Sequence, residues 1–363
     1  MIHQYKPDWD ITKKRLIEWW NHEYTGRALV GVTGTRKLKE YPVFPEPKTS
    51  DEKWFDHKYL TDVMEYEFQT TYYGGESIPV WNVGYPGWAQ PSAYIGDGSH
   101  IQMNMQTANR DHIYKRGMLS DYGIEKFTIN KNNPNYIRAE QMQKFVIKQA
   151  KGKAIPTNCT FVGSGDDFTD LRGATELIYD LFDCPEMVKK YDMHMVRQGV
   201  ENCHRLFDLL DARENGATTW YKLWAPGTNN ALYCDFSYNL STSLFVEFFF
   251  EQLQFVANSF DYNIYHLDGA ASLIHLGALL EIKNVHAFEV VPGVYPISPL
   301  HYIKELRQIQ EAGRSLYITI KPDEILTALD NLSAKGLYLH TYVSTQEEAE
   351  AIVKIVEQES KII

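Results

Sequence analysis

The stretch that decides the fold is NIYHLDGAASLIHLGALLEIKNVHAFEVV, residues 263–291. It opens with an apolar segment typical of a buried strand, continues as an amphipathic helix over residues 270–282, and closes with a second apolar strand over residues 285–291. A strand, a helix and a strand in this order form a βαβ unit, in which the two strands lie parallel. The stretch therefore predicts a parallel sheet covered by helices.

The same alternation extends in both directions along the chain. Apolar strands are predicted over residues 154–161, 217–224, 315–320 and 336–342, each followed by a helix, in one case after a loop. At least six βα units favour a closed barrel over an open doubly wound sheet, and no GxGxxG sequence follows any strand to indicate a dinucleotide fold. The predicted fold class is α/β, a (β/α)8 barrel with an N-terminal helical and irregular extension.

The N-terminal part, up to about residue 135, is rich in Trp and Tyr and less regular. A helix over residues 10–23, a strand over 27–34 and a helix over 58–73 are predicted in this part. A helix over residues 136–151 follows it. No linker separates the two parts. We therefore expect one domain over residues 1–363, in which residues 1–135 cover the barrel and residues 136–363 build its regular βα units.

Composition narrows the classes of partner. The chain has 363 residues, 44% of them hydrophobic, and a formal net charge of -11, which disfavours a nucleic acid or an anionic membrane as the main partner and leaves a small molecule. It lacks a run of about 18 apolar residues and an N-terminal secretory signal, so a cytoplasmic location is expected. Its four cysteines are scattered, so a metal would be held mainly by His and carboxylate side chains.

Ionisable side chains gather where predicted strands end. His266 and Asp268 close one strand, Glu289 lies on the next, and His340 lies at the end of the strand over residues 336–342. In a barrel these strand ends meet on one face, where active sites are built. Two imidazoles and two carboxylates can hold zinc or another divalent ion, or act as an acid and base set without a metal.

Each of these residues also has a structural interpretation. Asp268 could cap the following helix or open a turn, since Gly269 comes next. Glu289 could face a Lys or Arg of the helical layer, and His340 could be a hydrogen-bonded loop residue. His275 and His286 are interpreted as structural or surface residues.

A second group of residues is predicted to bind substrate. Aromatic side chains beside Gly- and Pro-rich loops suit a pocket wall or a stacking surface, although aromatics at strand ends also build cores. The acidic pair Asp166 and Asp167 follows the strand over residues 154–161. The predicted substrate-binding residues are Glu76, Trp81, Tyr85, Phe168, Trp220, Tyr221, Trp224 and Asp235.

The order of several motifs resembles the uroporphyrinogen decarboxylase superfamily. The matching segments are LRGATELIYDLFDCPEMVKK (171–190), DFSYNLSTSLFVEFFFEQLQFVANSFDYNIYHLDG (235–269), EVVPG (289–293) and GLYLHTYVSTQEEAEAIVKIVE (336–357). The resemblance covers about the last two-thirds of the chain and implies a TIM-type barrel. The Arg-rich N-terminal loop of true decarboxylases has no counterpart in GRALVGVTGTRKLKEYPVF, residues 26–44.

The other branch of this superfamily moves methyl groups between corrinoid proteins and thiols at a zinc site. The resemblance implies that His266 takes the place of the His of its His-x-Cys pair, that Asp268 replaces the Cys, and that Glu289 and His340 lie near the remaining ligands. Zinc is the metal this implies most directly. Without a thiolate ligand the site would be harder and other divalent ions become suitable.

Three functions remain open from the sequence. The first is a metal-dependent methyltransferase that moves a methyl group between a small substrate or thiol and a corrinoid carried by a partner protein. The second is a metal-free decarboxylase of uroporphyrinogen or another tetrapyrrole. The third is a non-catalytic barrel that binds a small ligand. A homodimer is compatible with each.

Overall fold

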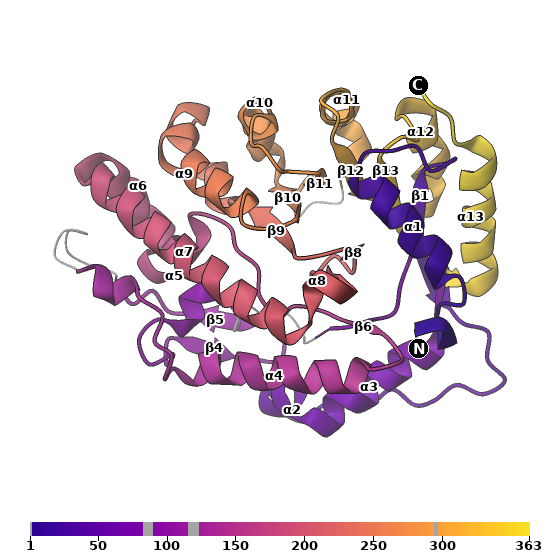
Figure 1. Ribbon diagram of the computed structural model, residues 1–363, viewed down its shortest axis with the longest axis horizontal. Coiled ribbons are helices and arrows are strands. Elements are labelled where there is room, and N and C mark those ends of the chain that lie inside the picture. The colour runs from indigo at the N-terminus through magenta and orange to yellow at the C-terminus, as the bar shows by residue number, and fades with distance from the viewer. Residues whose placement is uncertain (1, 83–89, 115–122, 294–296) are drawn as a thin grey trace.

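The computed structural model describes residues 2–82, 90–114, 123–293 and 297–363, and it has a mixed α/β architecture (Figure 1). Its centre is a seven-stranded, mostly parallel sheet with the order β2-β1-β13-β12-β11-β10-β9. These strands are β1 (Leu29–Thr35), β2 (Thr71–Gly75), β9 (Asn229–Tyr233), β10 (Tyr262–Asp268), β11 (Ala287–Val291), β12 (Ser315–Thr319) and β13 (Leu337–Thr345). Only β2 runs antiparallel to its neighbour in this sheet.

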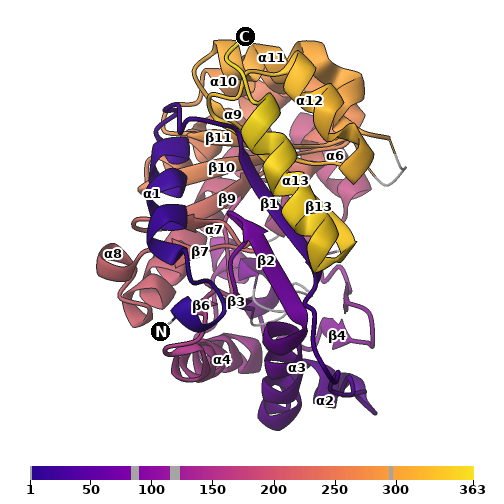
Figure 2. The ribbon, with the colours of Figure 1, turned by 90° about the vertical axis from the view of Figure 1, so that its right-hand side faces the viewer.

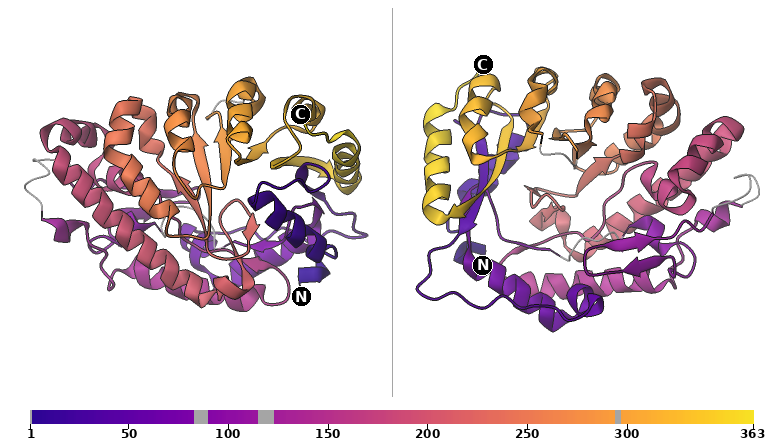
Figure 3. Two further views of the ribbon diagram at one scale, coloured as in Figure 1. Left: turned by 45° about the horizontal axis from the view of Figure 1, so that its top comes forward. Right: turned by 180° about the vertical axis from the view of Figure 1, so that it is seen from behind.

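Helices surround the sheet. They are α1 (Trp9–Trp20), α2 (Ser50–Phe55), α3 (His57–Thr70), α4 (Pro134–Ala150), α5 (Asp166–Arg172), α6 (Ala174–Asp183), α7 (Pro185–Leu209), α8 (Ala212–Asn215), α9 (Thr242–Ala257), α10 (Leu276–Leu280), α11 (Ile303–Glu311), α12 (Ile325–Asn331) and α13 (Gln346–Glu359). Helices α9 to α13 follow one another along the outside of the strands (Figure 3), and α13 packs on β1 and β13 (Figure 2). In the described ranges, no helix combines the length and apolar character needed to cross a membrane.

Three short strand pairs complete the described β structure. Strand β3 (Val80–Trp81) pairs in parallel with β6 (Ile155–Pro156), while β4 (Ile101–Met103) and β5 (Ala108–Arg110), and β7 (Ala217–Thr218) and β8 (Trp224–Ala225), form antiparallel pairs. The alternation of strands and helices and the parallel sheet are as predicted. Within the described ranges, the pairings do not form the continuous ladder of a closed eight-stranded barrel.

The predicted helix over residues 58–73 is three residues too long. Thr71, Tyr72 and Tyr73 instead open β2 and pair with Thr35, Gly34 and Thr33 of β1, respectively. These β-branched and aromatic side chains favour the extended conformation, and the neighbouring strand provides its hydrogen bonds. Helices α1 and α4 and strand β1 lie close to their predicted positions.

Strand β9 was missed because polar residues begin it. Asn229 donates a hydrogen bond from Nδ2 to the Ala217 carbonyl oxygen at 2.6 Å, and Asn230 donates from Nδ2 to the Val162 carbonyl oxygen at 2.8 Å. Both side chains thus donate hydrogen bonds inside the fold, so this buried strand begins without an apolar signature. The predicted strand over residues 217–224 divides into β7 and β8, and that over 154–161 shortens to β6.

The Trp- and Tyr-rich N-terminal part contributes to two of the buried clusters. Phe68, Trp81 and Met142 belong to one, between α3, β3 and α4, whereas Trp20 and Trp224 belong to another beneath α1. The second cluster also includes side chains of β10 to β13, among them Tyr317 and Tyr338.

Candidate metal site and adjoining pocket

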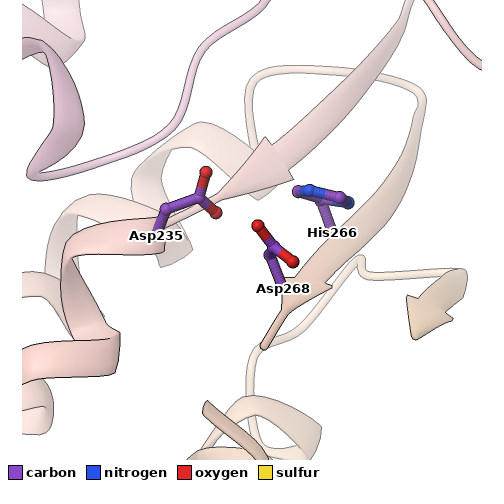
Figure 4. Close-up of side chains that lie close together, drawn as sticks. All are labelled: Asp235, His266 and Asp268. Atoms are coloured by element: carbon purple, nitrogen blue, oxygen red, sulfur yellow. The ribbon is translucent and has the colours of Figure 1, made fainter. Parts of the chain in front are cut away.

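Three side chains meet at the carboxyl ends of β9 and β10. Asp235 follows β9, and His266 and Asp268 project from one face of β10 because they are two residues apart. One ligand atom from each of the three lies within 4.8 Å of the others. Figure 4 shows the two carboxylates and the imidazole turned toward one another. We call Asp235, His266 and Asp268 the metal triad, because nitrogen and carboxylate oxygen are ligands of divalent ions.

Glu289 fixes the imidazole of the triad. It lies opposite His266 in the register of β10 and β11, and its Oε2 is 2.5 Å from His266 Nδ1. Both side chains are largely buried, at 13% and 10% exposure. A carboxylate that accepts from one ring nitrogen sets the tautomer and leaves the other, Nε2, to bind a metal. Glu289 therefore pairs with His266 and not with a Lys or Arg of the helical layer.

Charge is concentrated around the triad. Burial lowers the pKa of His266, but the hydrogen bond and charge of Glu289, with the charges of Asp235 and Asp268, outweigh it and raise the pKa overall. Loss of water and the repulsion of Asp268 and Glu289 raise the pKa of Asp235, which His266 partly offsets. Carboxylates gathered in this way favour a cation between them. The donor set therefore fits a divalent ion.

Asp268 does not cap the helix that follows it. The cap position of the 3-10 helix Ala270–His275 is Gly269, whose positive φ of 79° suits glycine. His275 is fully buried, with Nε2 3.0 Å from the Ser237 carbonyl oxygen and Nδ1 3.2 Å from Thr242 Oγ1. His275 is therefore a structural residue, as predicted. The Asp268 carboxylate does not cap the helix and can take part in the triad.

Asp166 positions Asp235 from a distant segment. Its carboxylate accepts hydrogen bonds from the backbone nitrogens of Asp235, at 2.8 Å, and Phe236, at 3.0 Å. Burial, followed by the charge of Asp235, raises the pKa of Asp166 well above its usual range. The acidic pair after the strand over residues 154–161 was the only signal in the sequence, and it did not indicate a contact with residue 235.

A pocket of about 530 Å³ adjoins the triad. Glu289 lines it, and so do Trp220 and Tyr221, whose ring centroids lie 5.1 and 6.2 Å from that of His266. The phenol of Tyr221 also faces Glu289, and burial followed by that carboxylate raises the pKa of Tyr221 well above its usual range. The two predicted aromatic residues are thus part of a pocket wall that packs against His266 and includes its partner Glu289.

His340 lies in this pocket rather than in the triad. Its Nδ1 is 3.3 Å from Thr319 Oγ1, and its ring stacks on Tyr317 with a centroid distance of 5.7 Å. Burial and the nearby charge of Lys222 lower the pKa of His340 to about 4. The ring is therefore neutral near pH 7, and it offers the pocket a polar surface without a positive charge.

Comparison with known proteins identifies the fold. No family model and no curated protein sequence matches this chain. Among solved structures, a methyltransferase from Methanosarcina mazei superposes with a TM-score of 0.59 over 96% of this chain and 98% of its own, at 11% sequence identity. The chain therefore shares the overall fold of a methyltransferase.

Glu76, predicted to bind substrate, instead lies in a buried ion pair. It accepts hydrogen bonds from both terminal nitrogens of Arg27, at 2.7 and 3.0 Å, from Arg15 at 3.1 Å and from the backbone nitrogen of Val30 at 2.9 Å. Its side chain has no exposed surface. These contacts connect α1, β1 and the end of β2.

Of the remaining residues predicted to bind substrate, three lie in the hydrophobic core and one lies outside the described residues. Trp81, Phe168 and Trp224 are at most 1% exposed and belong to hydrophobic clusters. Tyr85 lies outside the described residues. The sequence did not single out Tyr317 or Tyr342, which line the pocket, because aromatic residues in apolar strands look like core residues.

Proposed function

We propose that the protein is a metal-dependent methyltransferase that moves a methyl group between a small substrate or thiol and a corrinoid carried by a partner protein. The observation that carries this proposal is the metal triad, with His266 oriented by Glu289 and a pocket directly beside it. The fold shared with a methyltransferase supports it. We also propose that the sheet is part of a TIM-type barrel, whose strand ends provide the site.

Asp235, His266 and Asp268 would hold the metal. Zinc is proposed first, and the absence of a thiolate among these donors also suits manganese or ferrous iron. A bound divalent ion would supply Lewis acidity that lowers the pKa of a thiol or another substrate heteroatom. Glu289 keeps the proton on His266 Nδ1, and Asp166 keeps the chain at Asp235 in place.

The pocket would hold the small molecule. In methyl transfer the acceptor supplies the electron pair of the new bond to carbon, and the donor atom keeps the pair of the bond that breaks. Trp220 and Tyr221 exclude water beside His266, which favours a nucleophilic acceptor that water would otherwise solvate.

The charge of the pocket does not support a tetrapyrrole decarboxylase. A substrate with many carboxylates needs several cationic side chains. Among the described residues that line the pocket, Lys222 is the only Lys or Arg, and Glu67 and Glu289 are acidic. His340 adds no charge near pH 7.

Metal analysis tests the proposal. We expect about one equivalent of divalent metal per chain by inductively coupled plasma mass spectrometry after dialysis, and loss of that metal in His266→Ala and Asp268→Asn. His340→Ala is the matched control, since it removes an imidazole from the pocket but not from the triad. A metal-free protein that gains none on dialysis against zinc, manganese or ferrous iron would refute the proposal.

A further inference from the structure

We infer that the pocket beside His266 is a binding site for a quaternary ammonium cation, which is the small methyl-bearing substrate. The reaction assigned to this ligand rests on the proposed function, whereas its binding does not. The inference comes from the rings and charges that line the pocket.

Aromatic rings form a continuous wall around Tyr317. Its ring centroid lies 5.7 Å from Tyr221, 5.1 Å from Tyr338 and 5.7 Å from His340, and Tyr342 continues the wall 4.7 Å beyond His340. On the other side, Trp220 lies 5.2 Å from Tyr221. Ring faces attract cations, and groups of them bind quaternary ammonium ligands in particular. A volume of about 530 Å³ suits a small organic molecule.

The buried charges of the wall are negative. Glu289 is buried and Glu67, near the end of α3, is half-buried, whereas Lys222 is exposed to solvent. Burial raises the pKa of Tyr317 well above its usual range, so its ring is neutral. A quaternary ammonium needs no hydrogen-bond acceptor, and it therefore gains from ring faces and diffuse negative charge without losing specific hydration.

The pocket places such a cation next to the triad. Glu289 belongs to its lining and at the same time contacts His266 Nδ1. Transfer of one methyl group breaks a carbon–nitrogen bond, leaves its electron pair on nitrogen as a neutral tertiary amine, and forms a bond from carbon to an acceptor that supplies a pair. A thiolate or a reduced corrinoid is an acceptor of this class. The product amine is less well held, since it has lost the positive charge.

Titration calorimetry on the full chain, freed of metal by a chelator, tests the inference. The probes are choline and 3,3-dimethylbutan-1-ol, which has the same shape with carbon in place of the charged nitrogen. We expect choline to bind and its neutral analogue to bind at least about tenfold more weakly. Equal affinity of the two probes, or no binding of choline, would overturn the inference.

Three variants locate the site. Tyr317→Leu should weaken choline about tenfold, whereas Tyr317→Phe, which keeps the ring face, should stay within about threefold. Glu67→Gln should weaken choline but not the neutral analogue. Unchanged choline affinity in both Tyr317→Leu and Glu67→Gln, with melting curves showing folded proteins, would contradict the assignment.

The two proposals can fail separately. Asp268→Asn should lose metal and keep choline binding, because Asp268 does not line the pocket. Choline binding by a protein that takes up no metal would refute the methyltransferase proposal alone. Metal binding without choline binding would refute the substrate class alone.

Discussion

Glu289 is the residue on which the triad depends most. Its contact with His266 Nδ1 fixes the ring that would present Nε2 to a metal. We expect Glu289→Gln to lower metal affinity about 10- to 100-fold, because a neutral amide polarises the imidazole less. Competition with a chromophoric chelator measures this. Glu67→Gln, the same change elsewhere in the pocket, should leave metal affinity unchanged, and an equal loss in both variants would contradict the prediction.

Asp192 makes stability depend on pH. It is 1% exposed, and its carboxylate accepts from Ser164 Oγ at 2.6 Å and from the Gly165 backbone nitrogen at 2.9 Å. Burial raises the pKa of Asp192 from 3.8 to about 6. The folded state thus binds a proton more tightly than the unfolded state, and this stabilisation, about 3 kcal/mol, is present below pH 4 and lost as the pH rises through 6.

Asp192→Asn should remove this pH dependence. An amide keeps an acceptor for Gly165 and a group that can bond to Ser164. Urea unfolding from pH 4 to pH 7 measures the effect: relative to Asp192→Asn, the wild-type free energy of unfolding should fall by about 2 kcal/mol, since part of the stabilisation is already lost at pH 4. Parallel curves for the two proteins over this range would show that Asp192 does not titrate there.

For single residues, the sequence pointed to part of the candidate metal site but not to its exact membership. His266, Asp268 and Glu289 could be selected because each lies at the end of a predicted strand. Asp235 was assigned to the substrate and His340 to the metal. The position of each side chain depends on contacts with distant residues, which the hydrophobic periodicity of the sequence does not reveal. Asp235 is placed by hydrogen bonds from its segment to Asp166, and His340 is directed to the pocket by Thr319 and Tyr317.

Among elements, the buried Glu76 connects α1, β1 and the end of β2. Glu76→Gln removes the carboxylate paired with both terminal nitrogens of Arg27, which is 4% exposed, and leaves Glu357, 4.0 Å from Nε, as its ion-pair partner. Breaking a buried ion pair in this way typically costs about 3–5 kcal/mol. Urea unfolding should show a loss of that size, while choline affinity stays within about twofold. Glu40→Gln, an exposed site, is the control. A large loss of choline affinity in a stable variant would restore Glu76 as a substrate residue.

Helices and strands were predictable where the local sequence favours the same conformation as the contacts that the segment makes in the fold. The periodicity of α4 and the apolar runs of β10 to β13 were sufficient. Strand β9 was not, because Asn229 and Asn230 find their partners on distant segments. Strand β2 was not, because its pairing with β1 decides the conformation of residues whose apolar spacing also suits a helix.

In the whole sheet, β13 connects the N-terminal strands β1 and β2 to strands β9 to β12. It lies between β1 and β12. A chain ending at residue 333 would leave one edge of β1 and one edge of β12 without a partner strand, and it would lose the cover of α13. We expect it to lose its cooperative thermal transition and to bind anilinonaphthalene sulfonate. Removal of Ile362 and Ile363 alone, each 60% exposed, should leave the transition temperature unchanged. A cooperative transition in the longer truncation would contradict the prediction.

The order of the sheet also has a consequence for biosynthesis. Strand β1 leaves the ribosome early, and its parallel partner β13 leaves it late. During translation β2 can cover one edge of β1, while the other, with Leu29, Val30 and Val32, remains available to other chains. The strands that carry the metal triad are made before β13. In the nascent chain, the free edge of β1 therefore stays exposed after the strands of the metal triad have been made, until β13 emerges.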